Sequence, residues 1–115
     1  TLVNTNEQRM DIEAYRGFDA VAFGTPDYYS YIAGGLKVFL DDWFIACQKS
    51  RQGLENKPYG LFFSHGTGGR ARGPFEELFR RMGTQVGEMV DVFRTPDEAA
   101  LEACRALGRQ LANAV

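Results

Sequence analysis

Short apolar runs alternate with amphipathic stretches along this chain. Residues 19–24 form an apolar run that Gly24 and Pro26 close, as expected of a strand buried on both faces of a parallel sheet. The next stretch carries its apolar side chains on one helical stripe, namely Leu36, Phe39, Leu40, Trp43, Phe44 and Cys47. The pattern predicts a buried strand followed by an amphipathic helix.

A second strand and helix follow. Residues 58–64 form another apolar run, with Pro58 at its first position, where no hydrogen bond inside the sheet is lost. Pro74 suits the first position of a helix, and Gly83 can end that helix. The expected apolar face of this helix consists of Phe75, Leu78, Phe79 and Met82.

The last strand is predicted less clearly than the first two. Residues 86–93 predict a weaker strand that Gly87 interrupts. A capping box over residues 95–98 predicts the start of a final helix. Its expected core face holds Leu101, Cys104, Leu107 and Leu111.

The order β-α-β-α-β-α implies an α/β fold with a parallel sheet, right-handed crossovers and helices on both faces. We expect one domain over residues 1–115. Residues 1–6 resemble the end of a strand running into a turn. Three strands make a small sheet, so we expect that an N-terminal β-α(-β) part, not contained in this sequence, completes the domain.

Composition narrows the classes of function. Apolar residues make up 44% of the 115 residues, and the formal net charge of −2 gives no electrostatic basis for binding nucleic acid or an anionic membrane. No apolar run approaches the ~20 residues that span a bilayer, and no secretory signal is visible. We therefore expect a soluble, cytoplasmic protein with no nucleic-acid partner and no membrane span.

Metal-binding residues are scarce. A single histidine excludes a histidine-based metal cage. Cys47 and Cys104 lack the spacing of a ligand pair and fall on apolar faces of predicted helices. We therefore expect two reduced, buried thiols and no metal site.

Ligands of open α/β sheets bind outside the carboxyl ends of the strands, so the loops there are the candidate site. The loop after the first strand contains Tyr28, Tyr29 and Tyr31. Exposed tyrosine rings offer flat apolar faces that stack on a planar heterocycle. The rings could equally pack over the sheet edge or at a subunit interface, and the sequence leaves both interpretations open.

The loop after the second strand is rich in glycine and precedes a helix N-terminus. Its backbone N–H groups can approach a ligand closely and bond the carbonyls and ring nitrogens of a flavin. A plain flexible turn is the alternative. His65 could hydrogen-bond the flavin or move a proton, and Arg70 and Arg72 could meet a phosphate, although most exposed arginines are only solvated.

Part of this second loop also matches the dinucleotide fingerprint G-x-G-x-x-A, through Gly66, Gly68 and Ala71. Asp91, near the end of the next predicted strand, stands where a ribose-binding acid could lie. The match is short, and the fingerprint normally opens its domain, whereas a β-α unit comes first here. No Gly-Lys-Ser/Thr follows the glycines, which excludes a phosphate-binding P-loop.

With both loops identified, the chain resembles the flavodoxin superfamily, especially the flavodoxin-like NAD(P)H:quinone oxidoreductases. Residues 18–41 resemble that family's third strand, flavin-holding loop and following helix, and residues 57–69 resemble its next strand and second flavin loop. Three departures lie in the first loop: Asp27 at a variable position, Ser30 for a common glycine and Tyr31 for a common asparagine.

The resemblance implies a flavodoxin-like three-layer sandwich that holds FMN at the carboxyl edge of a five-stranded sheet. It also implies an oxidoreductase with NAD(P)H as electron donor, a quinone as acceptor and a homo-oligomeric assembly. By carry-over, one side of the flavin ring is lined by Thr25, Pro26, Asp27, Tyr28, Tyr29 and Ser30. The other side is lined by His65, Gly66, Thr67, Gly68 and Gly69.

The family's phosphate loop, a turn rich in Ser/Thr and Gly after the first strand, has no counterpart before Asp19. Either the segment that carries it is missing from this sequence, which we favour, or the protein has lost its FMN site. Three alternatives to a flavin oxidoreductase remain open. They are a non-catalytic flavodoxin-type electron carrier, a dinucleotide-binding protein, and a flavin-free interaction protein whose tyrosines form a dimer interface.

Overall fold

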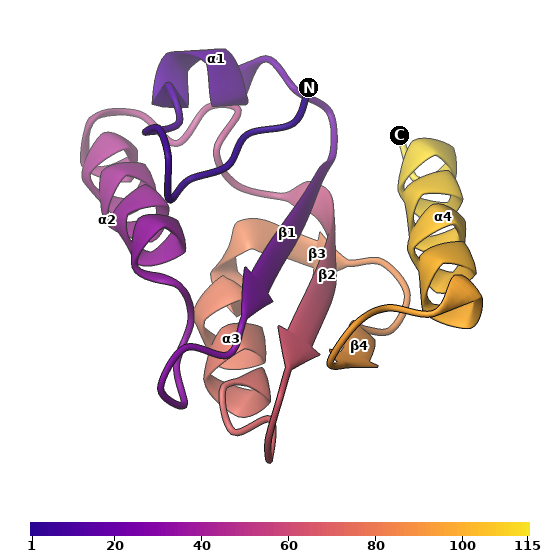
Figure 1. Ribbon diagram of the computed structural model, residues 1–115. Coiled ribbons are helices and arrows are strands. Elements are labelled where there is room, and N and C mark those ends of the chain that lie inside the picture. Colours follow the sequence, from indigo (N-terminus) through magenta and orange to yellow (C-terminus); the bar gives the residue numbers. More distant parts are fainter.

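The computed structural model describes residues 1–115 and shows a parallel sheet flanked by helices (Figure 1). The strands are β1 (Val21–Pro26), β2 (Lys57–His65), β3 (Gly83–Gln85) and β4 (Val90–Phe93). The helices are α1 (Ile12–Arg16), α2 (Gly34–Lys49), α3 (Arg72–Phe79) and α4 (Glu98–Asn113), and a 3₁₀ turn covers Arg80–Met82. The predicted α/β class and parallel sheet are confirmed.

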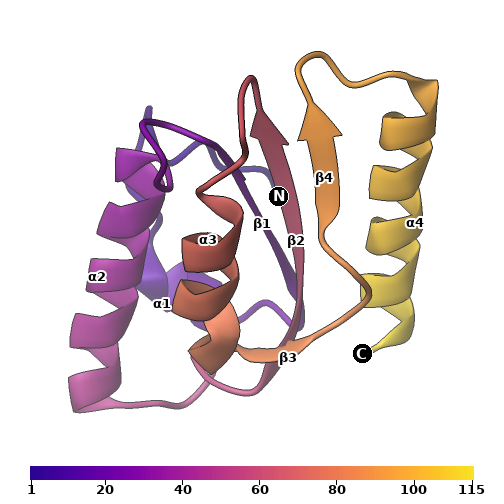
Figure 2. The ribbon, with the colours of Figure 1, turned by 90° about the horizontal axis from the view of Figure 1, so that it is seen from below.

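β2 is the central strand of the sheet. β1 pairs with one of its edges in parallel, from Val21 opposite Tyr59 to Pro26 opposite Ser64. β3 and then β4 pair in parallel with its other edge. Figure 2 shows α2 and α3 over one face of the sheet and α4 over the other. The chain therefore forms three layers, as predicted, and the carboxyl ends of β1, β2 and β4 lie at one edge.

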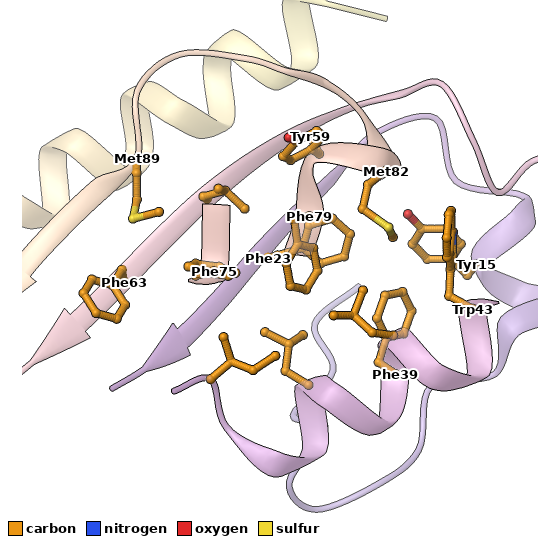
Figure 3. Close-up of a cluster of buried hydrophobic side chains, with 14 of the residues drawn as sticks. Tyr15, Phe23, Phe39, Trp43, Tyr59, Phe63, Phe75, Phe79, Met82 and Met89 are labelled. Atoms are coloured by element: carbon orange, nitrogen blue, oxygen red, sulfur yellow. The ribbon is translucent and has the colours of Figure 1, made fainter. Parts of the chain in front are cut away.

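The core fills the space between the sheet and helices α2 and α3 (Figure 3). Alternate residues of the strands point into it, and the Phe23 ring of β1 lies 4.5 Å from the Phe79 ring of α3 and 5.7 Å from the Phe39 ring of α2. The largest fully buried side chains are Phe63, Phe75, Phe79, Leu54, Leu61 and Met82. This aromatic core holds β1 and β2 in place, and with them the loops that follow.

β1 is an edge strand, and an apolar hollow of about 180 Å³ runs along its outer side. Residues 1–3, 5 and 20–24 line this hollow together with Met10, Tyr15, Phe18, Leu36, Phe39 and Phe62. We call it the β1 slot. On the face that carries α4, Ala22 is exposed and Phe62 is partly exposed, because α4 covers only part of that face.

The predicted single strand over residues 86–93 is wrong. The chain forms two short strands, β3 and β4, along the same edge of β2, and residues 86–89 bulge between them. The Val86 amide donates to the Tyr59 carbonyl at 2.7 Å, while Gly87 takes a φ of 68° that favours glycine. Gly87 marked the interruption correctly, but the three residues of β3 carry no apolar pattern.

Two helix starts differ from the prediction. α3 begins at Arg72, so Pro74 occupies its third position rather than its first. α4 is capped by Asp97, whose carboxylate accepts a hydrogen bond from the Ala100 amide at 2.8 Å. Asp97 replaces the expected Thr95 because aspartate is the better N-cap.

Part of the expected core face of α4 is also wrong. Leu107 and Leu111 are buried, but Leu101 and Cys104 are exposed. α4 has no helical neighbour on its side of the sheet, so only the stripe that touches the sheet is covered (Figure 2). Cys47 is a buried free thiol, as predicted.

The first residues do not end a strand as expected. Residues 1–10 make no strand pairing, and a turn closes where the Glu7 amide donates to the Asn4 carbonyl at 3.0 Å. The short helix α1, which the sequence pattern did not predict, is capped by the Asp11 carboxylate.

Candidate functional site at the carboxyl edge of the sheet

The loops after β1 and β2 lie side by side at the carboxyl edge of the sheet (Figure 2). The Asp27 amide donates to the Ser64 carbonyl at 2.8 Å, which continues the pairing of the two strands into the loops. The Asp27 carboxylate then accepts two further hydrogen bonds, from the Ser30 amide at 2.8 Å and from the Ala71 amide at 3.2 Å. One side chain therefore shapes the first loop and ties it to the second.

The first loop is a tight two-residue turn. Tyr28 and Tyr31 exchange backbone hydrogen bonds of 3.0 and 3.1 Å, and the residues between them, Tyr29 and Ser30, have φ values of 54° and 67°. Two positive φ values are the mark of a type I′ turn, which normally prefers glycine or asparagine. This turn therefore stores backbone strain, as functional loops often do.

Thr25 holds the backbone on both sides of this turn through its hydroxyl group. Its side chain is buried, and the hydroxyl donates to the Pro26 carbonyl at 2.8 Å and accepts from the Ala33 amide at 2.9 Å. Its hydrogen-bonding capacity is thus used inside the protein. Thr25 is a scaffold residue, whereas Tyr28, Tyr29 and Ser30 are exposed.

Two glycines of the second loop stand where neither the packing nor the backbone conformation requires glycine. A Cβ atom added to Gly66 or Gly68 would meet no heavy atom within 4 Å, and neither residue has a positive φ. Gly69 differs, because its φ is 66° and a Cβ atom there would lie 3.3 Å from the His65 ring. Gly66 and Gly68 therefore leave open space beside exposed backbone amides, which suits close approach of a ligand.

His65 is held on both ring nitrogens. Nε2 lies 2.9 Å from an Asp91 carboxylate oxygen, and Nδ1 lies 2.6 Å from the Thr67 carbonyl. The other Asp91 oxygen accepts a hydrogen bond from Arg72 at 2.6 Å, which raises the pKa of the Arg72 guanidinium. These contacts join the second loop, β4 and the start of α3.

This network alters two expectations. Arg72 is bound to Asp91 and Glu76, so of the two arginines considered for a phosphate only Arg70 is exposed without an ion pair. The dinucleotide fingerprint would use the Ala71 region and the Asp91 carboxylate, yet both already have partners within the chain. The arrangement therefore disfavours a dinucleotide site of that kind.

The structure brings the two predicted residue sets together at one edge, and it shows contacts of Phe93 and Asp91 with His65 that were not predicted. Phe93 packs against His65 with ring centroids 5.5 Å apart, and Asp91 pairs with the His65 imidazole instead of facing a ribose. Neither link has a local sequence signal, because each joins residues on separate strands. The β1 slot lies along the strand, away from these loops.

No helix of this chain is long and apolar enough to cross a bilayer, and no three potential ligands are grouped around a metal position. No protein-family model matches the sequence, and no curated protein sequence is significantly similar to it. Solved structures, in contrast, share its fold.

A flavodoxin from the domain Archaea superposes with a TM-score of 0.74 at 23% identity, covering 90% of this chain and 70% of that protein. A WrbA-like flavodoxin from Agrobacterium tumefaciens gives a TM-score of 0.70 at 22% identity, covering 90% of this chain and 69% of that one. Rubredoxin oxygen:oxidoreductase from Desulfovibrio gigas gives 0.68 at 23% identity; 84% of this chain matches only 23% of that protein.

These likenesses establish the class: the chain has the flavodoxin-like fold. The two loops after β1 and β2 occupy the sheet edge where ligands of such folds bind. Structural neighbours of this chain are flavodoxins and oxidoreductases, which is the class of protein the sequence resemblance also indicates.

Proposed function

We propose that this chain binds the ring of FMN between residues 25–30 and residues 65–69 and takes part in NAD(P)H-linked electron transfer to a quinone-type acceptor. The observation that carries this proposal is the pairing of two loops through Asp27 beside open space at Gly66 and Gly68. A planar ring needs flat apolar faces and nearby N–H donors, and this edge offers both.

The roles of individual residues follow from their surroundings. Tyr28 and Tyr29 are exposed and offer ring faces for stacking. The backbone amides around Gly66 and Gly68 are donors for the polar edge of the ring, while Thr25 and Asp27 hold the loop conformations. The flavin supplies the redox chemistry, and the protein supplies binding, orientation and electrostatics.

The residues of this chain offer more to the flavin ring than to its phosphate. No turn rich in Ser/Thr and Gly is present before β1, Arg72 is paired with Asp91, and only the exposed Arg70 is left as a charged partner for a phosphate. β1 pairs with β2 on one side only, so a further extended segment paired in parallel with its other side would end at the same sheet edge. We propose that a loop following such a strand holds the phosphate beside residues 25–30.

The main alternative is a non-catalytic electron carrier on the same fold. Carriers of this kind tend to be strongly acidic, and the net charge of −2 is small. Stopped-flow mixing of the flavin-loaded protein with NADH or NADPH separates the two. An oxidoreductase is reduced directly by the nicotinamide, whereas a carrier is not.

Titration with riboflavin and with FMN tests the binding proposal, because only FMN carries a phosphate. Quenching of flavin fluorescence by both ligands, with similar affinities, is expected for a site that holds only the ring. Absence of quenching by either ligand at millimolar protein would overturn the proposal. Markedly tighter binding of FMN would show that this chain does grip the phosphate.

A further inference from the structure

The His65 ring faces an oxygen acceptor at each nitrogen. Nε2 lies 2.9 Å from the Asp91 carboxylate, and Nδ1 lies 2.6 Å from the Thr67 carbonyl. A neutral imidazole has one N–H donor and one acceptor nitrogen, whereas the imidazolium has two donors. Only the protonated ring therefore satisfies both contacts at once.

Packing keeps the ring in this orientation. His65 stacks on Phe63, with centroids 5.4 Å apart and planes inclined by 21°, and Phe93 lies against it at 5.5 Å. The side chain is only 17% exposed. Two aromatic side chains therefore flank the ring, the buried Phe63 on one side and the exposed Phe93 on the other.

The charged groups around His65 alternate in sign. Asp91 of β4 binds both His65 and Arg72, and Arg72 of α3 continues to Glu76 at 3.2 Å. On the far side, the Arg94 guanidinium lies 4.9 Å from the centre of the Phe93 ring. The chain His65–Asp91–Arg72–Glu76 is balanced when His65 is charged, and it carries one excess negative charge when His65 is neutral.

Two further charged groups lie at this edge. The Asp27 carboxylate is bound to the Ser30 and Ala71 amides, and Arg70 is exposed without an ion pair; neither makes a hydrogen bond or ion pair with His65. A neutral imidazole that donates from Nε2 to Asp91 has no hydrogen on Nδ1. The lone pair on Nδ1 would then face the Thr67 carbonyl lone pairs, and that contact would be repulsive.

We propose that His65 is a protonation switch for the second loop: its charged form holds residues 66–69 closed through Thr67, and its neutral form releases them. Gly66 and Gly68 have no packing contacts at their Cβ positions, whereas Gly69 is also held where its carbonyl accepts a hydrogen bond from the Arg72 amide at 3.2 Å. His65 is thus a positioning residue that acts through the loop backbone. Applied to the flavin, which rests on the function proposed above, the switch makes ring binding weaken as the pH rises.

Nitrogen-resolved NMR of the flavin-free protein tests the switch itself. At pH 6 both ring nitrogens of His65 should carry protons, and the amide signals of Gly66, Gly68 and Gly69 should shift with the same midpoint as the His65 ring. His65→Gln should abolish that shared titration, and Glu88→Gln, which alters an exposed carboxylate with no ion pair, should leave it unchanged. A ring with one proton at pH 6, or glycine amides that do not follow His65, would overturn the proposal.

Riboflavin binding at pH 6 and pH 8.5 tests the consequence, since riboflavin has no phosphate to titrate. The wild-type protein should bind about tenfold more weakly at pH 8.5, and His65→Gln should bind equally at both values. Equal wild-type affinity at both values would overturn the link between the switch and the ligand. Failure to bind at either value would contradict the proposed flavin function, while the NMR titration would still decide whether the switch exists.

Discussion

The Asp27 carboxylate accepts a hydrogen bond from the Ala71 amide at 3.2 Å, although the two residues are 44 positions apart. Ala71 is the N-cap of α3, so Asp27 places a negative charge at the end of a helix where backbone N–H groups lack partners. The same carboxylate binds the Ser30 amide. The two loops are therefore one structural unit, and the candidate site depends on Asp27 through these backbone hydrogen bonds.

Replacing Asp27 with alanine should loosen both loops. The change removes two hydrogen bonds to a charged acceptor, and we expect a loss of about 2 kcal/mol in the free energy of unfolding, measured by urea denaturation. Glu7→Gln is a matched control, because Glu7 is exposed and makes no side-chain hydrogen bond. A stability unchanged in Asp27→Ala would show that the link between the loops contributes nothing.

Alanine at Gly66 or Gly68 should weaken riboflavin binding while leaving the stability of the protein nearly unchanged. Neither position meets a neighbour or needs a positive φ, so stability should change by less than about 0.5 kcal/mol, while riboflavin affinity should fall. Gly83→Ala is the contrasting variant. Its φ is 153° and a Cβ atom would lie 1.9 Å from the Lys57 carbonyl oxygen, so we expect a loss of about 3 kcal/mol or more. Unchanged riboflavin affinity in both loop variants would remove these glycines from the site.

Glycine at Ser30 should relieve the strain of the first turn. Ser30 has a φ of 67°, which glycine adopts without penalty, and we expect a gain of about 1 kcal/mol in the free energy of unfolding. Ser50→Gly should give no such gain, because Ser50 is extended with a φ of −158°. Thermal unfolding compares the two variants, and a Ser30→Gly protein less stable than the wild type would argue against the turn geometry.

Phenylalanine at Tyr15 should stabilise the protein and change its response to alkali. The Tyr15 hydroxyl is buried without a hydrogen-bond partner, so its removal should add about 1 kcal/mol at neutral pH. Burial, with a smaller effect of Cys47, raises the pKa of the Tyr15 phenol above its usual range. The unfolded chain therefore loses this proton first, near pH 10, and stability falls as the pH rises past that value.

Tyr15→Phe should consequently lose less stability than the wild type between about pH 9 and 11. Burial also raises the pKa of Cys47, which adds an alkaline loss to both proteins, while burial lowers the pKa of Lys57, which acts in the opposite direction in both. Tyr28→Phe is the control, because Tyr28 is exposed. Parallel stability curves for Tyr15→Phe and the wild type would contradict this account.

The sequence predicted β1, α2 and β2 well because their apolar patterns are long and continuous. One residue of the expected apolar stripe of α2, Phe44, is wrong, because its side chain is exposed. It missed the division between β3 and β4, since two short strands of half-exposed residues have no distinct periodicity. The sequence also placed Leu101 and Cys104 on the buried face of α4, although both are exposed. Their apolar spacing is the same whether or not another element covers that side of the helix.

The sequence indicated which residues lie at the candidate site, but not how those residues contact one another. The order of strands and loops sufficed to bring residues 25–30 and 65–69 to one edge. The hydrogen bond from the Ala71 amide to the Asp27 carboxylate joins distant segments, and so does the His65–Asp91 pair. Local sequence patterns do not encode such contacts. The positive φ of Tyr29 and Ser30 had no signal either, because neither residue is glycine.

The two loops after β1 and β2 are proposed to hold a flavin ring together. Backbone amide chemical shifts of the protein, recorded during titration with riboflavin, test this proposal most directly. We expect the largest changes at residues 25–31 and 65–71, with a single saturating affinity for both segments. Changes confined to the β1 slot, or no changes at saturating riboflavin, would contradict the claim.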